Sequence, residues 1–243
     1  MHFPSKAVAS FSIYLPLIAW ISSYLFVPLR RNLKGITMKH LLTRPASLIS
    51  IVFLVLALLH FSPLALPYKL AYPLAFLTLC ALRFCPWPMV LAMGFSALGD
   101  LMGACHNFWA QMGAFALAHA AFILYFVRTY RRDRATDGIR WKSVLVALYG
   151  LTVSTLILPH VHGPLLAGVS VYILMIISMC ILAWMQKNPY YAVGAWLFVV
   201  SDTILAWNKF VSPIEWSGYL IMIPYYLGQW VLFIQSMREQ RRG

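Results

Sequence analysis

Two aspartates inside long apolar stretches are the residues of this sequence most able to do chemistry. Asp100 and Asp202 each follow a run of apolar and small side chains. A carboxyl group in the centre of a membrane helix costs about 2.5–3.5 kcal/mol on insertion scales, so it normally faces a bundle interior or a wet cavity. The other four acids lie in loops or near the C-terminus: Asp133, Asp137, Glu215 and Glu239. We therefore interpret the two aspartates as functional. The alternative is a role in assembly alone.

Two buried carboxyl groups are suited to acid–base catalysis. Burial favours the protonated form, and a second carboxyl nearby favours it further in one member of the pair. One aspartate could then donate a proton while the other stays ionised and activates water. The sequence has no GxSxG motif and no glycine-rich phosphate loop, so neither a serine hydrolase nor a phosphate-loop enzyme is indicated.

Other polar side chains in these apolar stretches could line the same cavity. Ser96 precedes Asp100 by one helical turn, Ser201 adjoins Asp202, and Asn208 and Lys209 follow at the end of that stretch. A polar side chain inside a span needs a hydrogen-bond partner, so the three buried candidates in other stretches either line the site or stabilise packing. These three are His119, Tyr226 and Gln229.

We expect neither a metal nor a cofactor. His106, His160 and His162 fall near the predicted outer ends of helices, but their spacing matches no known zinc-ligand pattern. The cysteines form no CxxC pair, and all lie in or at the end of apolar stretches: Cys80, Cys85, Cys105 and Cys180. Free cysteines in such places behave as small apolar residues.

The composition is that of a membrane protein. Hydrophobic residues make up 62% of the 243 residues and charged residues 10%, against about 25% in ordinary soluble domains. Nine apolar runs approach the length of about 20 residues that a spanning helix needs. They are 11–28, 46–62, 70–84, 88–105, 109–127, 143–159, 164–185, 190–207 and 217–236. The sequence therefore predicts an all-α, polytopic transmembrane bundle without a large soluble domain.

The basic residues predict the orientation of these spans. If the nine runs alternate and the 29–45 loop is cytoplasmic, 16 Lys and Arg residues lie on the cytoplasmic side and 3 on the other. Such an asymmetry is typical of a correct span count, and it predicts a cytoplasmic C-terminus. The net charge of +13 thus reflects topology and contact with membrane lipids rather than nucleic acid binding. Asp100 and Asp202 then lie at similar depth on helices that run in the same direction.

Four segments together resemble the lysoplasmalogenase (YhhN-like) family of membrane proteins. They are SALGDL (96–101), GAFALAH (113–119), SDTILAWNKF (201–210) and YYLGQ (225–229). Lys69 followed by Pro73 is similar to the Lys-Pro start of the family's second helix. The resemblance covers residues 40 to 236, and the SDxxLAxNKF stretch is its most specific part.

The resemblance implies eight spans and hydrolysis of the vinyl ether bond of lysoplasmalogens, which are lyso-ether phospholipids. The family's two catalytic acids map onto Asp100 and Asp202. The residues that we expect to contact the lysophospholipid substrate are Lys69, Ser96, His119, Ser201, Asn208, Lys209, Tyr226 and Gln229. We expect the protein to reside in a bacterial inner membrane. The sequence does not predict the oligomeric state.

Two features depart from the family pattern. The run at 11–28 is an additional span, so we expect an N-terminal extension at 1–37 before an eight-helix domain at 38–243, with Met38 as an alternative start. Phe122 stands where the family's His-x-x-Tyr pattern has Tyr.

Two other functions compete with this interpretation. A proton-coupled transporter, or another non-enzymatic membrane protein, could use the same two aspartates as proton carriers. An intramembrane aspartyl protease is less well supported, because its two acidic motifs would occur here in the wrong order.

Overall fold

The computed structural model describes residues 45–133 and 140–241. The chain divides into two compact units, Met1–Leu48 and Ile49–Gly243, and the following description concerns the second. The expected additional span at 11–28 and the expected extension at 1–37 lie outside the described residues.

Each apolar run predicted from residue 46 onward is a helix. The helices are α3 (Pro45–Phe61), α4 (Tyr72–Phe84), α5 (Trp87–Ala104), α6 (Phe108–Asp133), α7 (Arg140–Ile157), α8 (Pro164–Trp184), α9 (Pro189–Ala206) and α10 (Ser217–Gln240). A short 3-10 turn, η2 (Leu158–His160), follows α7, and a π-helical segment, η3 (Trp207–Val211), extends α9. The described residues contain no β-strand.

Proline starts several of these helices. It occupies one of the first two positions of α4, α5, α8 and α9, where its missing N–H costs nothing. At the start of α9, the Asn188 side chain also accepts a hydrogen bond of 3.1 Å from the Tyr190 amide. The sequence thus fixes the beginning of the helix that carries Asp202.

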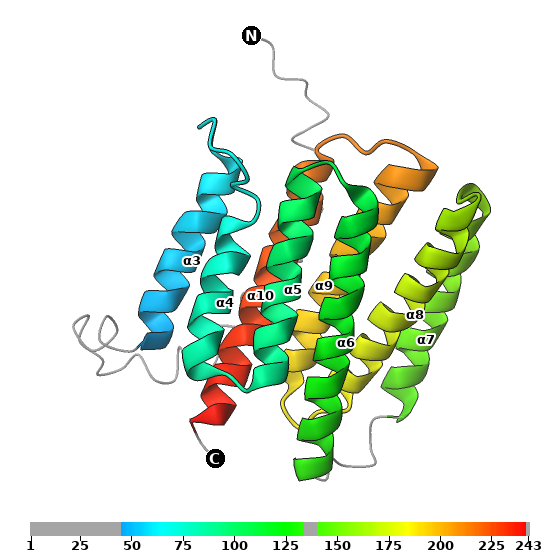
Figure 1. The fold of residues 1–243 in the computed structure, drawn as a ribbon. Helices are drawn as coiled ribbons and strands as arrows, with labels where there is room; N and C mark the ends of the chain where they lie inside the picture. Colours follow the sequence, from blue (N-terminus) through cyan, green and yellow to red (C-terminus); the bar gives the residue numbers. More distant parts are fainter. Residues whose placement is uncertain (1–44, 134–139, 242–243) are drawn as a thin grey trace, which may run out of the picture. The chain divides into compact units, whose positions relative to one another are not determined.

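The fold is an all-α membrane bundle. Five of the described helical segments are long and apolar enough to cross a membrane: Phe108–Arg131, Ser143–His160, Pro164–Trp184, Pro189–Val211 and Ser217–Gln240. The apolar α3 and α4 are shorter. The C-terminal ends of α4, α6, α8 and α10 lie together at the bottom of Figure 1. These ends carry most of the described basic residues, as the alternation predicted.

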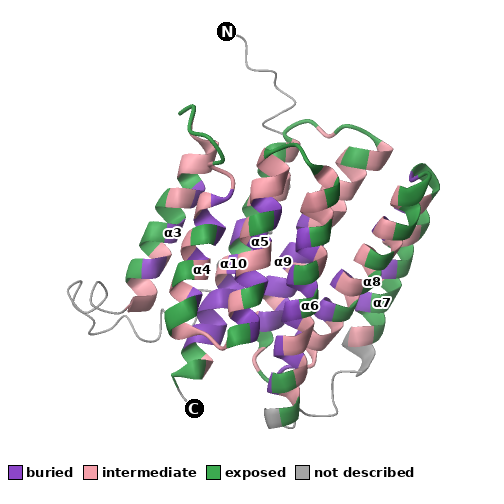
Figure 2. Cartoon of the chain, in the orientation of Figure 1, coloured by how far each residue is buried: buried purple, intermediate pink, exposed green. Residues whose placement is uncertain are grey.

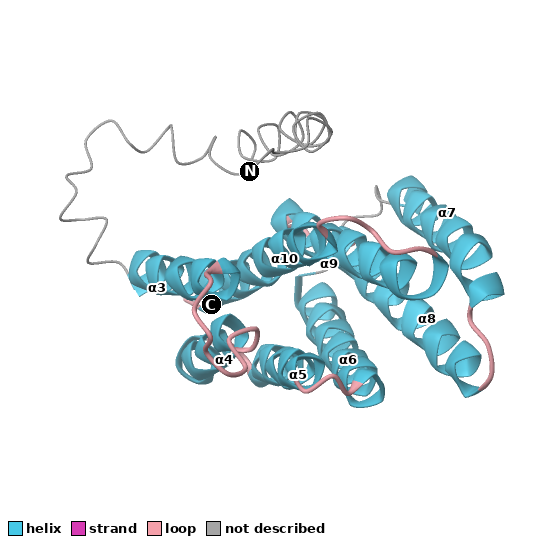
Figure 3. Ribbon diagram, turned by 90° about the horizontal axis from the view of Figure 1, so that it is seen from above, coloured by secondary structure: helices cyan, strands magenta, loops and turns pink. Residues whose placement is uncertain are grey.

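The helix contacts link α6, α8 and α9 to the rest of the bundle. α5 packs against α6, α9 packs against α10, and α8 contacts both α6 and α9, while α7 packs on α8 (Figure 3). Buried residues concentrate on α9 and α10 and in the part of α5 and α6 that faces them (Figure 2). α7 stays largely exposed, which in a membrane means contact with lipid.

Two glycines allow α9 and α10 to come close together. A Cβ atom added to Gly228 would lie 2.8 Å from the backbone oxygen of Gly194, and one added to Gly194 would lie 3.1 Å from the Gly228 oxygen. Small residues let membrane helices approach in this way. Such close packing stabilises the bundle because lipid is as apolar as the helices, so the hydrophobic effect does not drive them together.

The two aspartates occupy equivalent levels of the bundle. Asp100 is 13 residues past Trp87, the first residue of α5, and Asp202 is 13 residues past Pro189, the first residue of α9. At 1.5 Å per residue each lies about 20 Å along its helix. Both helices run upward in Figure 1, so the predicted common direction is confirmed.

Replacing Gly228 by Ala should destabilise the bundle. The new methyl group meets the Gly194 backbone, which can yield only if α9 and α10 separate, and overpacking of this kind costs about 1–3 kcal/mol. Thermal unfolding of the purified protein in detergent would measure the loss. Gly113→Ala is the matched control, because its Cβ meets nothing within 4 Å. Equal melting temperatures for the two variants would contradict this account.

Candidate functional site

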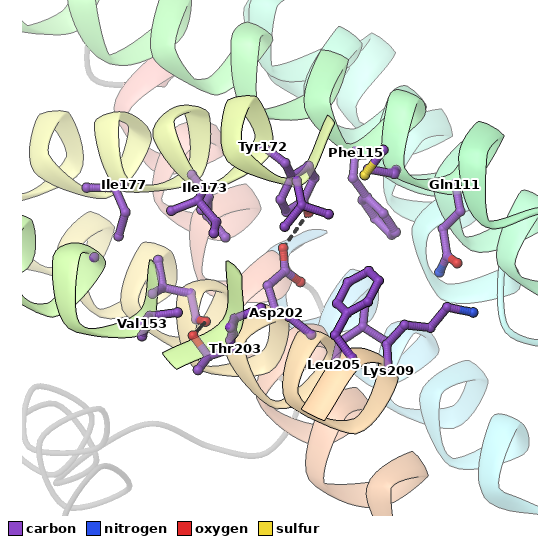
Figure 4. Close-up of a pocket in the computed structure, with 18 of the residues that line it drawn as sticks. Gln111, Phe115, Val153, Tyr172, Ile173, Ile177, Asp202, Thr203, Leu205 and Lys209 are labelled. Atoms are coloured by element: carbon purple, nitrogen blue, oxygen red, sulfur yellow. Dashed lines mark hydrogen bonds between the residues drawn. The ribbon is translucent and has the colours of Figure 1, made fainter. Parts of the chain in front are cut away.

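Asp202 lies in the wall of a cavity between α6, α7, α8 and α9 (Figure 4). The cavity has a volume of about 70 Å³, several times the roughly 10–15 Å³ that one water molecule needs on the same measure. Most of its lining is apolar and includes Met112, Val153, Ile173 and Ile177. A carboxyl group in such surroundings must be solvated by protein groups.

Tyr172 and His119 provide that solvation. The Tyr172 hydroxyl donates a hydrogen bond to Asp202 Oδ2. His119 Nε2 lies 3.1 Å from the Tyr172 oxygen and 3.7 Å from Asp202 Oδ2. Since the Tyr172 proton points to the carboxylate, the Tyr172 oxygen is free to accept from His119, which favours the tautomer with hydrogen on Nε2. The structure therefore brings the predicted His119 to Asp202.

The cavity has a polar end formed by Lys209 and Gln111. Both side chains line it and lie together at one end in Figure 4. The Lys209 amine is 4.6 Å from the centroid of the Phe108 ring, a cation–π distance. The predicted Lys209 thus lies in the same cavity as Asp202.

Asp100 is buried beside this cavity but is not among the described residues that line it. Only 2% of Asp100 is exposed, and its Oδ2 has no hydrogen-bond partner among the described residues. Phe115, which lines the cavity, packs against Gly99 next to Asp100. The two aspartates interact electrostatically with each other, and Tyr225 interacts with both.

Ser96 and Gln229 form a pair on the Asp100 side. Gln229 Nε2 donates a 3.0 Å hydrogen bond to Ser96 Oγ, and both residues are fully buried. Ser96 lies one turn before Asp100 on α5, and Gln229 lies one turn after Tyr225 on α10. Gln229 Oε1 has no partner within the described part of the chain. The bond joins α5 to α10 next to the buried acid.

Ser201 and Asn208 bind backbone groups rather than facing the cavity. Ser201 Oγ donates 2.9 Å to the Ile221 carbonyl, three residues before the proline inside α10. Asn208 Oδ1 accepts 2.7 Å from the Ile214 amide and so fixes the turn after η3. Their predicted contact with substrate stays a prediction.

Lys69 and Tyr226 both bind the segment between α3 and α4, and neither lines the cavity. The Lys69 amine donates to the carbonyls of Ser62 and Leu64, at 2.6 and 3.0 Å. The Tyr226 hydroxyl donates 2.9 Å to the Leu70 carbonyl. Both side chains hold the loop between α3 and α4, and their predicted substrate contacts also stay predictions.

Tyr172 was not predicted from the sequence as a residue of this site. It lies in the most apolar of the five long segments, where a single hydroxyl has the same need for a partner as the histidine and glutamine that were noticed. This need for a hydrogen-bond partner could have identified Tyr172 from the sequence. Within the described ranges, no three His, Cys, Asp or Glu side chains gather where they could hold a metal ion.

Comparison with known proteins places the chain in a family. A model of the YhhN family matches residues 40–236, so the chain belongs to the YhhN family. Lysoplasmalogenase TMEM86A of Bos taurus is 26% identical over 190 residues, which cover 66% of this chain and 77% of the relative.

Two further relatives match shorter parts of their own lengths. Lysoplasmalogenase TMEM86B of Homo sapiens is 29% identical over 59% of this chain and 61% of the relative. Lysoplasmalogenase TMEM86B of Sus scrofa is 32% identical over 55% of this chain and 56% of the relative. The matched region is thus less than two thirds of each of these two proteins. No solved structure matches the chain.

Replacing Tyr172 by Phe should destabilise the protein, because Asp202 and His119 lose their shared hydroxyl partner. An unsatisfied buried polar group costs about 1–3 kcal/mol, and more if it is charged. Tyr149→Phe is a matched control on the same cavity. Its hydroxyl donates to Thr203 Oγ1, which remains bonded to the Val199 carbonyl. Thermal unfolding should show a larger loss for Tyr172→Phe, and a larger loss for Tyr149→Phe would contradict the assignment.

Proposed function

We propose that this member of the YhhN family hydrolyses the vinyl ether bond of lysoplasmalogens. The products would be a fatty aldehyde and glycerophosphoethanolamine or glycerophosphocholine. The observation that carries the proposal is Asp202, held by Tyr172 and His119 in the wall of an apolar cavity with Lys209 at its polar end. The names of the relatives support the same reaction.

The reaction needs one proton donor and one acceptor. A proton added to the second carbon of the vinyl ether breaks the double bond and leaves an oxocarbenium ion at the carbon attached to oxygen. Water adds to that carbon and gives up one proton, forming a hemiacetal. The hemiacetal collapses when its hydroxyl proton moves to the ether oxygen and the C–O bond to glycerol breaks. No net proton is consumed, so a carboxyl pair that exchanges one proton suffices.

Asp202 is the carboxyl that faces the reacting atoms in this proposal. Its charge stabilises the oxocarbenium ion, and its Tyr172 bond fixes its orientation. Asp100 acts from behind the cavity wall, through its electrostatic interaction with Asp202 and Tyr225. In this proposal one carboxyl group of the pair gives up a proton and the other accepts one.

We propose that the substrate reaches the site from the membrane. The basic ends of the helices would face the cytoplasm of a bacterial cell, with the C-terminus on that side. Lys209 then lies toward the outer end of the bundle, at headgroup level. It is seven residues past Asp202, about 10 Å along the helix, so its amine can meet the phosphate while the ether bond lies at Asp202.

Asp202→Asn and Asp100→Asn should each abolish aldehyde release from a lysoplasmalogen. Loss of general acid–base catalysis lowers rates by about 10²–10⁴-fold. The assay uses purified protein in detergent, where hydrolysis proceeds but gradient-driven transport cannot. Glu215→Gln, in an exposed loop, should keep full activity. Retained activity in both Asp variants with normal folding would refute the mechanism, and an inactive wild type would favour the transporter.

Lys209→Gln should raise KM for a lysoplasmalogen and leave kcat little changed, because it removes a charge that binds the phosphate equally in ground and transition states. A neutral 1-alkenylglycerol has no phosphate, so its KM should be the same for Lys209→Gln and the wild type. Lys187→Gln is the control, since this lysine is exposed in the loop between α8 and α9 and does not line the cavity. Equal changes in KM for both substrates would show that Lys209 does not contact the phosphate.

A further inference from the structure

The cavity at Asp202 differs in character between its two ends. Lys209 and Gln111 form one end, Asp202 and Tyr172 occupy the middle, and Val153, Ile173 and Ile177 form the other end (Figure 4). A ligand that fits this order has an ionic group, then a reactive polar bond, then a hydrocarbon. The order is that of a single-chain lipid.

The apolar end lies between α7 and α8. Gly150 on α7 and Ile177 on α8 both line the cavity there, and a Cβ atom at Gly150 would lie only 2.7 Å from Ile177. The two helices therefore come close together at this point and narrow the cavity. Ile177 is five residues past Tyr172, so the narrowing lies about 7–8 Å beyond Asp202 along α8.

The unlike ends of the cavity favour one orientation of such a ligand. A hydrocarbon placed at the Lys209 end would remove the ammonium group from polar contact, which costs several kcal/mol. A phosphate placed at the Ile177 end would find no basic side chain among the described residues that line the cavity there, and an unpaired charge in that place is also costly. Both penalties favour the same direction of binding.

We propose that the α7–α8 end of the cavity is a subsite for the alkenyl chain and that Ile177 limits the chain length that the protein accepts. This inference rests on the proposed hydrolysis. The chain enters tail first between α7 and α8, the ether bond stops at Asp202, and the phosphate stays at Lys209. Ile177 contacts the alkenyl chain at the narrowing that it forms with Gly150.

The test compares Ile177→Phe with wild type on two lysoplasmalogens, one with an octenyl and one with an octadecenyl chain. The larger ring blocks the subsite, so the ratio of kcat/KM for the short over the long chain should rise by about tenfold or more, since small changes of fit in an apolar pocket are worth 10–200-fold. Ile177→Ala should move the ratio the other way. Leu174→Phe is the control, because Leu174 lies on the same helix but is 68% exposed.

A second readout needs no catalysis. A non-hydrolysable alkyl lysophospholipid with a diazirine at the end of its tail should cross-link to α7 or α8 in the wild type, and Ile177→Phe should reduce this. An active wild type whose chain-length ratio is the same in Ile177→Phe and Leu174→Phe would overturn the subsite and leave the hydrolysis intact. An inactive wild type that still cross-links to α7 or α8 would instead refute the hydrolysis and support the subsite. Cross-links confined to other helices would overturn the subsite in either case.

Discussion

A carboxyl group inside a membrane has no water to solvate it, so protein groups must take water's place. Asp202 meets this demand through the Tyr172 hydroxyl, with His119 next to both. The three residues come from α9, α8 and α6. Packing of α8 against both α6 and α9 therefore brings the polar groups together, and the space left between these helices and α7 is the cavity.

Asp100 is accommodated differently. Its helix packs closely on α6, where Gly99 receives the Phe115 ring, and the Ser96–Gln229 bond ties it to α10. The acid is buried behind aromatic side chains and does not open to the cavity as Asp202 does. The two carboxyl groups therefore differ in access, because Asp202 faces the cavity and Asp100 is enclosed.

The polar residues of the bundle fall into two groups, those at the cavity and those bonded to the main chain. His119, Lys209 and the unexpected Tyr172 surround the cavity or the carboxyl that faces it. Ser201, Asn208, Lys69 and Tyr226 bind main-chain carbonyls or amides near helix ends. Unpaired backbone groups are as costly in a membrane as unpaired side chains. The same residue types therefore surround the cavity in one place and satisfy the chain's own hydrogen bonding in another.

The sequence by itself determined the helices, because apolar length, proline at helix starts and the clustering of basic residues act locally along the chain. It also determined that Asp100 and Asp202 lie at one level, since each is counted from the start of its own helix. Only the tertiary structure decided which polar side chains meet. Tyr172 stands far in sequence from Asp202, and the neighbours Ser201 and Asp202 point to different partners. These partners depend on how α6, α8, α9 and α10 pack against one another. No local sequence pattern encodes that packing.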